Sequence, residues 1–208
     1  MLGSYTTSGR LYETYLRLRP NGASGLLVSS ISAFKDYQLK EAWVWEHQAL
    51  TRARFSAGDR RIGEAFEEIR REVLRLPRDL KMLKDEIVKM RQKMHEGHPN
   101  HSALFDIKHD SGGMVDIEFM VQYLVLAHAH RHPELLPNSG NLALLKVAAE
   151  LGLIDVGLSE KVRELYRTLR RMQHKMRLND ASPCRIRQEE IDTAPCRELW
   201  ERLFGPST

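Results

Sequence analysis

The first part of the chain alternates between apolar and polar positions with a period of two. Between residues 11 and 19, one side carries Tyr12, Thr14, Leu16 and Leu18, and the other carries Glu13, Tyr15, Arg17 and Arg19. This alternation predicts a half-buried strand. A Pro-Asn-Gly turn at 20–22 and the run at 25–28 predict a returning strand. Because an isolated hairpin is only marginally stable in water, we expect this hairpin to be the remnant of a larger sheet.

From residue 31 to the end, apolar positions recur every three or four residues, which is the period of amphipathic helices. The pattern predicts helices over 31–54 with a bend near 40, and over 60–75, 79–95, 113–131, 141–151, 158–178 and 188–203. Glycine and proline residues separate these segments. The predicted fold class is therefore mainly α, with a short β-hairpin followed by an antiparallel helical bundle.

The composition is that of a globular chain, because 42% of the 208 residues are apolar and 29% are charged. A chain of this length can bury a core without metals or disulfides, so we interpret Cys184 and Cys196 as reduced thiols. The sequence has no apolar run of about 18 residues and no secretion signal at its start. These features predict a cytoplasmic protein with no membrane partner.

The charges are nearly balanced and their signs are interspersed. Thirty-two Lys and Arg residues stand against 28 Asp and Glu residues, which gives a net charge of +4. A nucleic-acid partner is therefore not expected. An RNA-binding helical protein, suggested by the pI of about 9.1 and the many arginines, is a weaker alternative.

Two arginines on the predicted strand are the first candidates for binding chemistry. Arg17 and Arg19 lie two residues apart, so both guanidinium groups project from one face roughly 7 Å apart. This spacing can hold two oxygens of a polyphosphate through charge-assisted hydrogen bonds. The alternative is a solvated strand face that simply carries two arginines, and spacing alone leaves both interpretations open.

A second candidate is the polar helix predicted around residues 41–54. Trp43 and His47 lie one turn apart, and Glu46 and Arg54 fall on another row of the same helix. These side chains either face a ligand or pack and pair within the protein, and the spacing does not decide between the two.

A third candidate is the acidic segment 105–119. Its carboxylates are Asp106, Asp110, Asp116 and Glu118. They could surround a divalent cation, but their spacing does not match a calcium-binding loop. Acidic residues at a helix start also accept hydrogen bonds from free N–H groups, and we favour capping and interdomain contacts for these residues. The histidines at 95, 98 and 101 lack the spacing of a zinc hydrolase and are interpreted as solvated.

Three long stretches resemble the glutamine synthetase adenylyltransferase/adenylyl-removing enzyme family. They are LYETYLRLRPNGASGLLVSS at 11–30, AFKDYQLKEAWVWEHQALTRARFSAGD at 33–59 and FDIKHDSGGMVDIEFMVQYLVL at 105–126. The resemblance implies a nucleotidyltransferase domain followed by a helical domain, in each of two halves. One half adds AMP from ATP to a tyrosine of glutamine synthetase, and the other removes it by phosphorolysis. The run at 45–50 is similar to the adding, C-terminal half, so the chain resembles a truncated piece of that half.

The same resemblance assigns roles to residues of the predicted strand. Arg17 and Arg19 match the family's Arg-Leu-Arg-Pro residues, which implies contacts to the triphosphate or active site. The family's metal-binding Asp-x-Asp pair is absent, and Tyr15 stands where the pattern has its third Asp. A phenol with a pKa of about 10 is a poor ligand for a hard metal. Glu13 lies on the same strand face and is the alternative carboxylate, displaced by one pleat repeat.

These implications complete the set of expectations. Residues 1–58 are expected to be the C-terminal part of a nucleotidyltransferase domain, with a hairpin remnant of its sheet, and 59–208 a helical bundle domain. The parent enzyme uses Mg²⁺ and ATP, neither of which is expected to bind tightly to this chain, which we expect to be inactive alone. Expected partners are glutamine synthetase, a PII signalling protein and the rest of the parent polypeptide. The alternative is a non-catalytic helical interaction module that binds glutamine synthetase or a PII protein.

Overall fold

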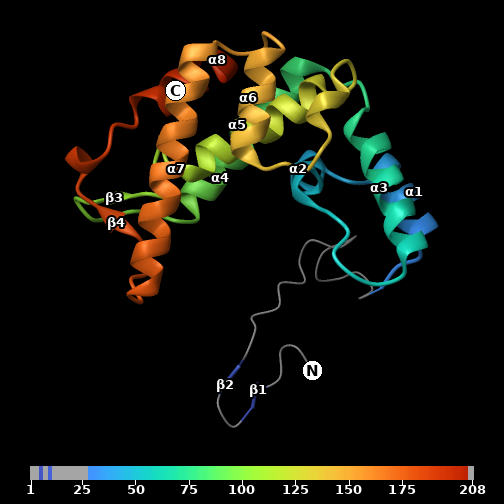
Figure 1. Ribbon diagram of the computed structural model, residues 1–208, viewed down its shortest axis with the longest axis horizontal. Coiled ribbons are helices and arrows are strands. Elements are labelled where there is room, and N and C mark those ends of the chain that lie inside the picture. Colours follow the sequence, from blue (N-terminus) through green and yellow to red (C-terminus); the bar gives the residue numbers. More distant parts are fainter. Residues whose placement is uncertain (1–4, 7–8, 11–27, 206–208) are drawn as a thin grey trace.

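The computed structural model of the chain describes residues 5–6, 9–10 and 28–205, and these form a mainly helical protein (Figure 1). The helices are α1 Ile31–Lys40, α2 Val44–Arg52, α3 Arg60–Leu74, α4 Leu80–Glu96, α5 Met114–His128, α6 Asn141–Glu150, α7 Val156–Leu178 and α8 Ala194–Phe204. Short 3₁₀ turns occupy Pro133–Leu135 and Gln188–Glu190. The strands are β1 Tyr5–Thr6, β2 Gly9–Arg10, β3 Phe105–Asp106 and β4 Arg185–Ile186.

The predicted helices are confirmed, with differences at some of their ends. The bend expected near residue 40 is a full break, because α1 ends at Lys40 and α2 begins at Val44. The helix predicted from 188 begins only at Ala194, with a proline in its first turn, and residues 188–190 form a separate 3₁₀ turn. Proline is well placed there because the first N–H groups of a helix have no internal partner.

The strands differ from the prediction in two respects. The hairpin predicted over 11–28 falls almost entirely outside the described residues, so it stays a prediction. The pair β1–β2 lies just before it, and a second antiparallel pair, β3–β4, was not predicted. In that pair Phe105 lies opposite Ile186, so it joins segments about eighty residues apart in the chain. Strands of two residues carry too little periodicity for a sequence pattern to reveal.

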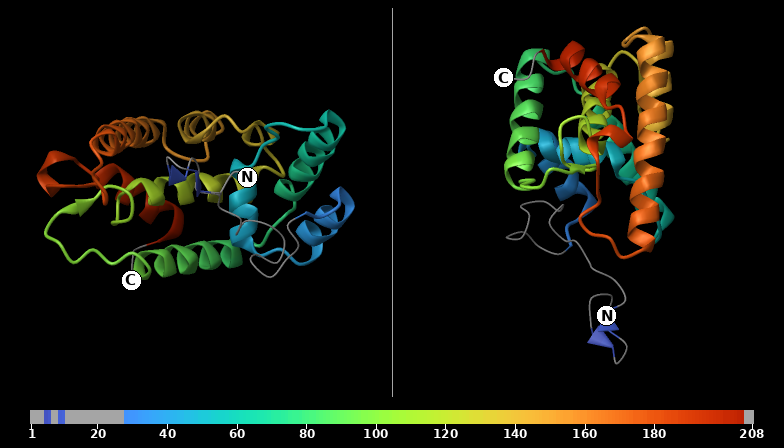
Figure 2. Two further views of the ribbon diagram at one scale, coloured as in Figure 1. Left: turned by 90° about the horizontal axis from the view of Figure 1, so that it is seen from below. Right: turned by 90° about the vertical axis from the view of Figure 1, so that its left-hand side faces the viewer.

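The main core is built around α5. The sequence of this helix, MVDIEFMVQYLVLAH, is apolar almost all round, and such a helix is stable only when it is covered on every side. Seen from below, α4 lies on one side of α5, and α6 and α7 lie on the other (Figure 2). The apolar faces of these helices and of α8 complete the core. Both cysteines are buried free thiols, as predicted.

A smaller core joins α1, α2 and α3 at the end of the molecule away from α7 (Figure 1). Leu50, Ile69 and Val73 form its centre. The rings of Phe34 and Phe66 pack beside them with centroids 5.7 Å apart. Among the described residues, no helix is both long enough and apolar enough to cross a membrane.

The central core predicts the cost of removing one buried side chain. Leu145 in α6 is fully buried, whereas Leu178 at the end of α7 is 73% exposed. We expect Leu145→Ala to lower the free energy of unfolding by about 2–5 kcal/mol, since it loses apolar contacts and leaves a cavity. The matched control, Leu178→Ala, should change it by less than about 0.5 kcal/mol. Urea unfolding followed by circular dichroism measures both, and equal losses would contradict this account of the core.

Candidate functional site

The strand residues that the sequence singled out cannot be placed. Glu13, Tyr15, Arg17 and Arg19 all fall in 11–27, outside the described residues, so their roles stay predictions. The described chain resumes at Val28, and α1 begins directly afterwards. Ser30 caps α1, because its Oγ accepts a hydrogen bond from the Ala33 N–H at 3.2 Å. The polar helix α2, which follows α1, is therefore the first predicted candidate that the structure tests.

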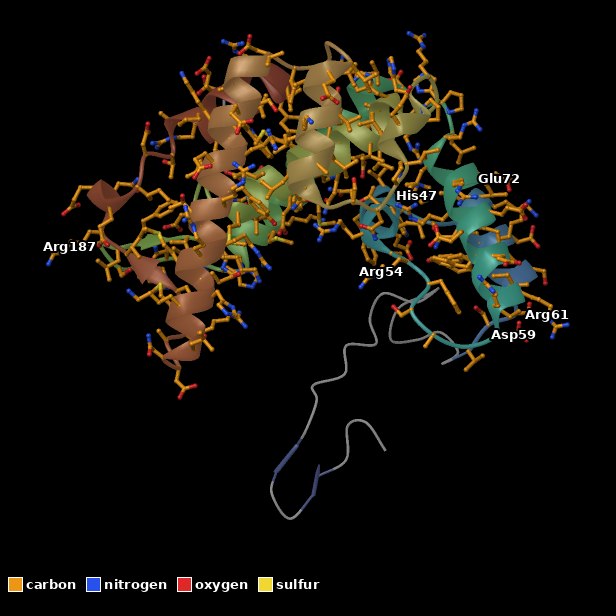
Figure 3. All side chains as sticks on the ribbon, in the orientation of Figure 1. His47, Arg54, Asp59, Arg61, Glu72 and Arg187 are labelled. Atoms are coloured by element: carbon orange, nitrogen blue, oxygen red, sulfur yellow. The ribbon has the colours of Figure 1, made fainter. Side chains whose placement is uncertain are left out.

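Helix α2 is polar in sequence but buried in the structure. Glu46, His47, Gln48 and Thr51 are each less than a tenth exposed. Buried polar groups are costly unless they form hydrogen bonds. Each of these side chains has an internal partner, and together they connect α2 to its neighbours. Figure 3 labels His47 of α2, between the main core and the α1–α3 end of the molecule, and Arg54, which is predicted on this helix but lies just after it.

Glu46 ties the start of α2 to α1. Its carboxylate accepts hydrogen bonds from the Tyr37 hydroxyl at 2.9 and 3.0 Å and from the Trp43 N–H at 2.9 Å. The contact with the Trp43 N–H caps the first turn of α2, where N–H groups have no helical partner. Trp43 itself is 66% exposed while His47 is buried, and both help to line a surface cleft of about 400 Å³ beside Arg78.

His47 connects α2 to α1 and to the α3–α4 turn. Its Nε2 lies 2.9 Å from the Gln38 carbonyl and its Nδ1 lies 3.3 Å from Nη2 of Arg78. These partners assign a neutral imidazole that donates from Nε2 and accepts at Nδ1. Burial lowers the pKa of His47, and the positive charge of Arg78 lowers it further. Burial also lowers the pKa of Arg78, to about 10.

Arg70 of α3 satisfies the end of α2. Its guanidinium donates to the carbonyls of Leu50 at 3.0 Å, Thr51 at 2.9 Å and Leu136 at 2.9 Å. The last carbonyls of a helix have no internal partner, and a cation there also opposes the helix dipole. Because Arg70 is only 3% exposed, water cannot readily replace it. Arg70 therefore holds α2, α3 and the segment before α6 together.

A hydrogen-bonded chain continues from α2 across the main core. Arg52 donates to Asn141 at 2.9 Å, Asn141 donates to the Tyr166 hydroxyl at 2.8 Å, and that hydroxyl donates to Glu118 at 2.9 Å. Burial and the nearby Glu118 carboxylate raise the pKa of Tyr166 to about 12. Glu118, a candidate cation ligand by sequence, thus serves as an acceptor inside the protein.

The other carboxylates of the acidic segment cap their own loop. Asp106 accepts the N–H groups of Lys108 and His109, at 2.9 and 3.0 Å. Asp110 accepts the Asp106 N–H at 2.8 Å. These contacts satisfy the loop itself and not the start of α5, so the helix-start capping favoured from the sequence does not apply to Asp106 and Asp110.

Asp116 forms a buried ion pair with Arg91 of α4 and accepts the Gly112 N–H at 2.6 Å. Gly112 has a φ of +88°, and a Cβ there would lie 2.8 Å from Cβ of Thr193, so the start of α8 packs directly against this turn. Across the part of the chain that the structure describes, no group of three or more His, Cys, Asp or Glu side chains is placed to hold a metal.

The histidines at 95, 98 and 101 lie in different surroundings, and His95 belongs to the last turn of α4 rather than to the loop. His98 stacks on His109, with ring centroids 4.2 Å apart, and its Nδ1 lies 2.9 Å from the Met94 carbonyl. His95 contacts the carbonyl of His109 at 3.4 Å, and His101 is exposed. The stacking of His98 on His109 was not predicted, because the two residues are eleven positions apart in sequence and only the loop fold brings them together.

One charged surface was missed by the sequence interpretation. We call it the α7 basic face, and it comprises Lys108, Arg170, His174, Lys175 and Arg177. Four of these residues, all but Lys175, help to line a cleft of about 400 Å³ between α7 and the start of α5. The signal was present in the sequence: five basic residues and no acidic one within 170–177. It was overlooked because the charge of the whole chain is nearly balanced.

Two family models match different parts of the chain. Residues 1–69 match the model described as glutamate-ammonia ligase adenylyltransferase, and residues 86–183 match the model described as GlnD PII-uridylyltransferase. The first match ends within α3 and the second begins within α4.

Individual relatives match nearly the whole chain, and they are named bifunctional glutamine synthetase adenylyltransferase/adenylyl-removing enzyme. The relative from Aromatoleum aromaticum is 57% identical over 206 residues, which cover 98% of this chain and 22% of the relative. The relative from Chromobacterium violaceum is 56% identical over 98% of this chain and 23% of its own length. The relative from Nitrosomonas europaea is 54% identical over 98% of this chain and 24% of its own length. The family resemblance found in the sequence is confirmed, and the chain spans less than a quarter of the length of these relatives.

The junction around α2 predicts a large effect at Arg70. Arg70→Gln leaves at least two of its three buried carbonyls without a donor, and we expect it to lower the free energy of unfolding by about 3 kcal/mol. The neighbouring Arg71 is exposed, so Arg71→Gln should change it by less than about 0.5 kcal/mol. Guanidinium unfolding measures both variants. A loss at Arg71 as large as that at Arg70 would show that helix propensity, not the carbonyl contacts, matters here.

His47 predicts a pH dependence of stability. The pKa of His47 is lower in the folded protein than the ordinary value of 6.5. As the pH falls, His47 therefore becomes protonated in the unfolded chain at a higher pH than in the folded protein. The contribution of His47 to the free energy of unfolding is therefore fully present above pH 6.5 and is lost as the pH falls through the folded-state pKa. His47→Gln should reduce the fall in Tm between about pH 7.5 and about pH 5.5, measured by differential scanning calorimetry.

The pKa values of His109 and His128 are also lowered by burial, but both histidines are present in the wild type and in the His47→Gln variant. The difference between wild type and variant therefore reports His47. An identical fall in Tm for the wild type and the variant would refute the assignment of this pH dependence to His47.

Proposed function

The chain is homologous, over nearly all of its length, to the bifunctional glutamine synthetase adenylyltransferase/adenylyl-removing enzymes, and from this premise we propose that it is the C-terminal, adenylyltransferase-side piece of such an enzyme. The observation that carries the proposal is the 57% identity to the Aromatoleum aromaticum protein over 206 residues. The match of residues 1–69 to the adenylyltransferase family model supports it, since that range includes Arg17 and Arg19 of the predicted strand.

The proposed activity of the parent enzyme is transfer of AMP from ATP to a tyrosine of glutamine synthetase, in the control of nitrogen assimilation. In this proposal Arg17 and Arg19 contact the triphosphate. Mg²⁺ and ATP are bound by an upstream segment that carries the Asp-x-Asp pair, because this chain has no such pair. The described residues offer no cluster fit to replace it. When bound, the metal would neutralise the phosphates during transfer.

Residues 28–205 are proposed to support the catalytic strand from behind. Contacts of α2 with α1, α3 and α5 make one hydrogen-bonded unit of the helices that follow the strand. The proposed domain boundary at 58/59 falls in the loop between α2 and α3. A strand whose arginines grip an anion needs such a rigid base, because small displacements of a catalytic group cost large factors in rate.

A second candidate function is a non-catalytic helical interaction module in the cytoplasm. It is favoured by the match of residues 86–183 to the PII-uridylyltransferase model, whose name links it to PII proteins. Under this proposal the helices α4 to α7 bind a PII signalling protein or glutamine synthetase. Calorimetric titration of the chain with each protein tests it, and no heat with either would exclude it.

The first proposal predicts the outcome of an adenylylation assay. Residues 1–208 with radiolabelled ATP, Mg²⁺ and purified glutamine synthetase should transfer no AMP above the background without enzyme. The full-length Aromatoleum aromaticum relative is the positive control. Robust labelling of glutamine synthetase by residues 1–208 would refute the proposed inactivity of the chain.

A chimera isolates the contribution of Tyr15. The segment of the Aromatoleum aromaticum relative that precedes the matched region is joined in frame to this chain. If Tyr15 impairs the metal site, Tyr15→Asp should raise AMP transfer by at least about tenfold, because even indirect partners of a metal contribute that much. Glu13→Gln in the unmodified chimera tests the alternative carboxylate. A loss of activity at Glu13 with no gain at Tyr15→Asp would show that Glu13 is the ligand.

A further inference from the structure

We propose that the α7 basic face is a docking surface for an acidic patch on the protein substrate, which, if the proposed function holds, is glutamine synthetase. The surface comprises Lys108, Arg170, His174, Lys175 and Arg177, as defined above.

The first support is a change in charge pairing along α7. In its first half, Arg163 and Arg167 pair with Glu160 and Glu164. Beyond them, and counting only the described residues, no member of the basic face has a carboxylate partner. Within the described ranges, Arg170 donates only to the amide oxygen of Gln173, at 3.3 Å. This end of α7 therefore carries exposed positive charge that no acidic residue of the described part of the chain pairs with.

The helix dipole does not account for this charge. Cations are favoured at a helix C-terminus, but the effect falls off within the last turn. It can explain Lys175 and Arg177, which lie in the last turn of α7. Arg170 lies more than two turns before the end, and Lys108 comes from the loop before α5. A shared face built from two separate segments calls for a different explanation.

The geometry presents these charges outward. Arg170, His174 and Arg177 are spaced by four and three residues, so they share one face of α7. With Lys108 they line the cleft of about 400 Å³, where Glu118 is already an acceptor for Tyr166. The C-terminal end of α7 projects past β4 (Figures 1 and 2). An approaching partner can therefore reach this end without meeting the rest of the helical body.

An acidic protein surface fits this face better than a nucleic acid. The α7 part of the face, residues 170–177, is only about 10 Å long at 1.5 Å per residue. Binding of single strands normally adds aromatic side chains on which bases stack, and this face has none. Next to it, Leu178 is 73% exposed, and Met176 is half-buried. Arginine and methionine beside an apolar contact are typical of protein interfaces.

The test measures binding of the full chain to purified glutamine synthetase from Aromatoleum aromaticum by biolayer interferometry. The variant is Arg170→Gln with Arg177→Gln. The control is Arg61→Gln with Arg202→Gln, which removes two exposed arginines paired with Asp59 and Glu198. Figure 3 labels Arg61 and Asp59, which lie at the start of α3, far from α7. Because exposed charges act mainly through long-range attraction, we expect about tenfold weaker binding of the variant at about 50 mM salt, and less than about threefold at about 500 mM. The control should bind as wild type does.

Four results would overturn the proposal. One is equal binding of the variant and wild type, and another is an equal loss in the control. The third is no binding of glutamine synthetase by wild type, and the fourth is tighter, steeply salt-dependent binding of transfer RNA. Circular dichroism checks folding, and Lys175→Glu, at an exposed position, is a second variant that should weaken binding similarly.

The same samples separate this proposal from the proposed function. The full-length Aromatoleum aromaticum relative is assayed for AMP transfer to the same glutamine synthetase, and so is the chimera. If the chimera transfers AMP while the Arg170 and Arg177 substitutions leave binding unchanged, only the docking surface is refuted. If the relative transfers AMP and the chimera with Tyr15→Asp does not, the proposed function is refuted.

Discussion

The arrangement of the helices depends on the need to satisfy buried carbonyl groups at the end of α2. Arg70 meets this need for Leu50 and Thr51 and at the same time reaches Leu136, far along the chain. A buried carbonyl without a hydrogen-bond donor lowers the free energy of unfolding by about 1–3 kcal/mol, which is a large part of the total of about 5–15 kcal/mol for a typical protein. The position of α3 relative to α2 is therefore fixed by a guanidinium group with three acceptors rather than by apolar packing alone.

The same principle governs the centre of the molecule. Helix α5 is buried along most of its length, and residues 114–117 at its start are each no more than 5% exposed, so its first turn cannot rely on water. Asp116 supplies an acceptor to the preceding turn and is itself neutralised by Arg91 of α4. A buried ion pair contributes little net stability against an apolar pair, but removing one partner is expensive. The pair thus specifies how α4 meets the start of α5 more than it strengthens the fold.

The two ends of the helical body differ in how their polar side chains are buried and paired, and this difference fits the two roles proposed for them. At the α1–α3 end, polar side chains are buried and paired, and in our proposal these helices are a rigid base for the strand predicted over 11–19. At the free end of α7, positive charges are exposed and unpaired within the described residues. In the proposed function, the first end supports the predicted strand and the second end attracts the protein substrate.

The sequence by itself determined the class of the fold and the positions of nearly all helices, because periodicity and Gly or Pro punctuation are local properties. It also carried the family resemblance, since long identical strings need no structure to be compared. It could not decide whether Glu46, His47 and Glu118 face a ligand or the protein interior. Spacing along one helix says nothing about what the neighbouring helices supply.

Only the tertiary structure decided those cases, by bringing Tyr37 to Glu46, Arg78 to His47 and Tyr166 to Glu118. It likewise paired β3 with β4 and left the end of α7 uncovered. The physical reason is that the cost of burying a polar group depends on partners that come from distant parts of the chain.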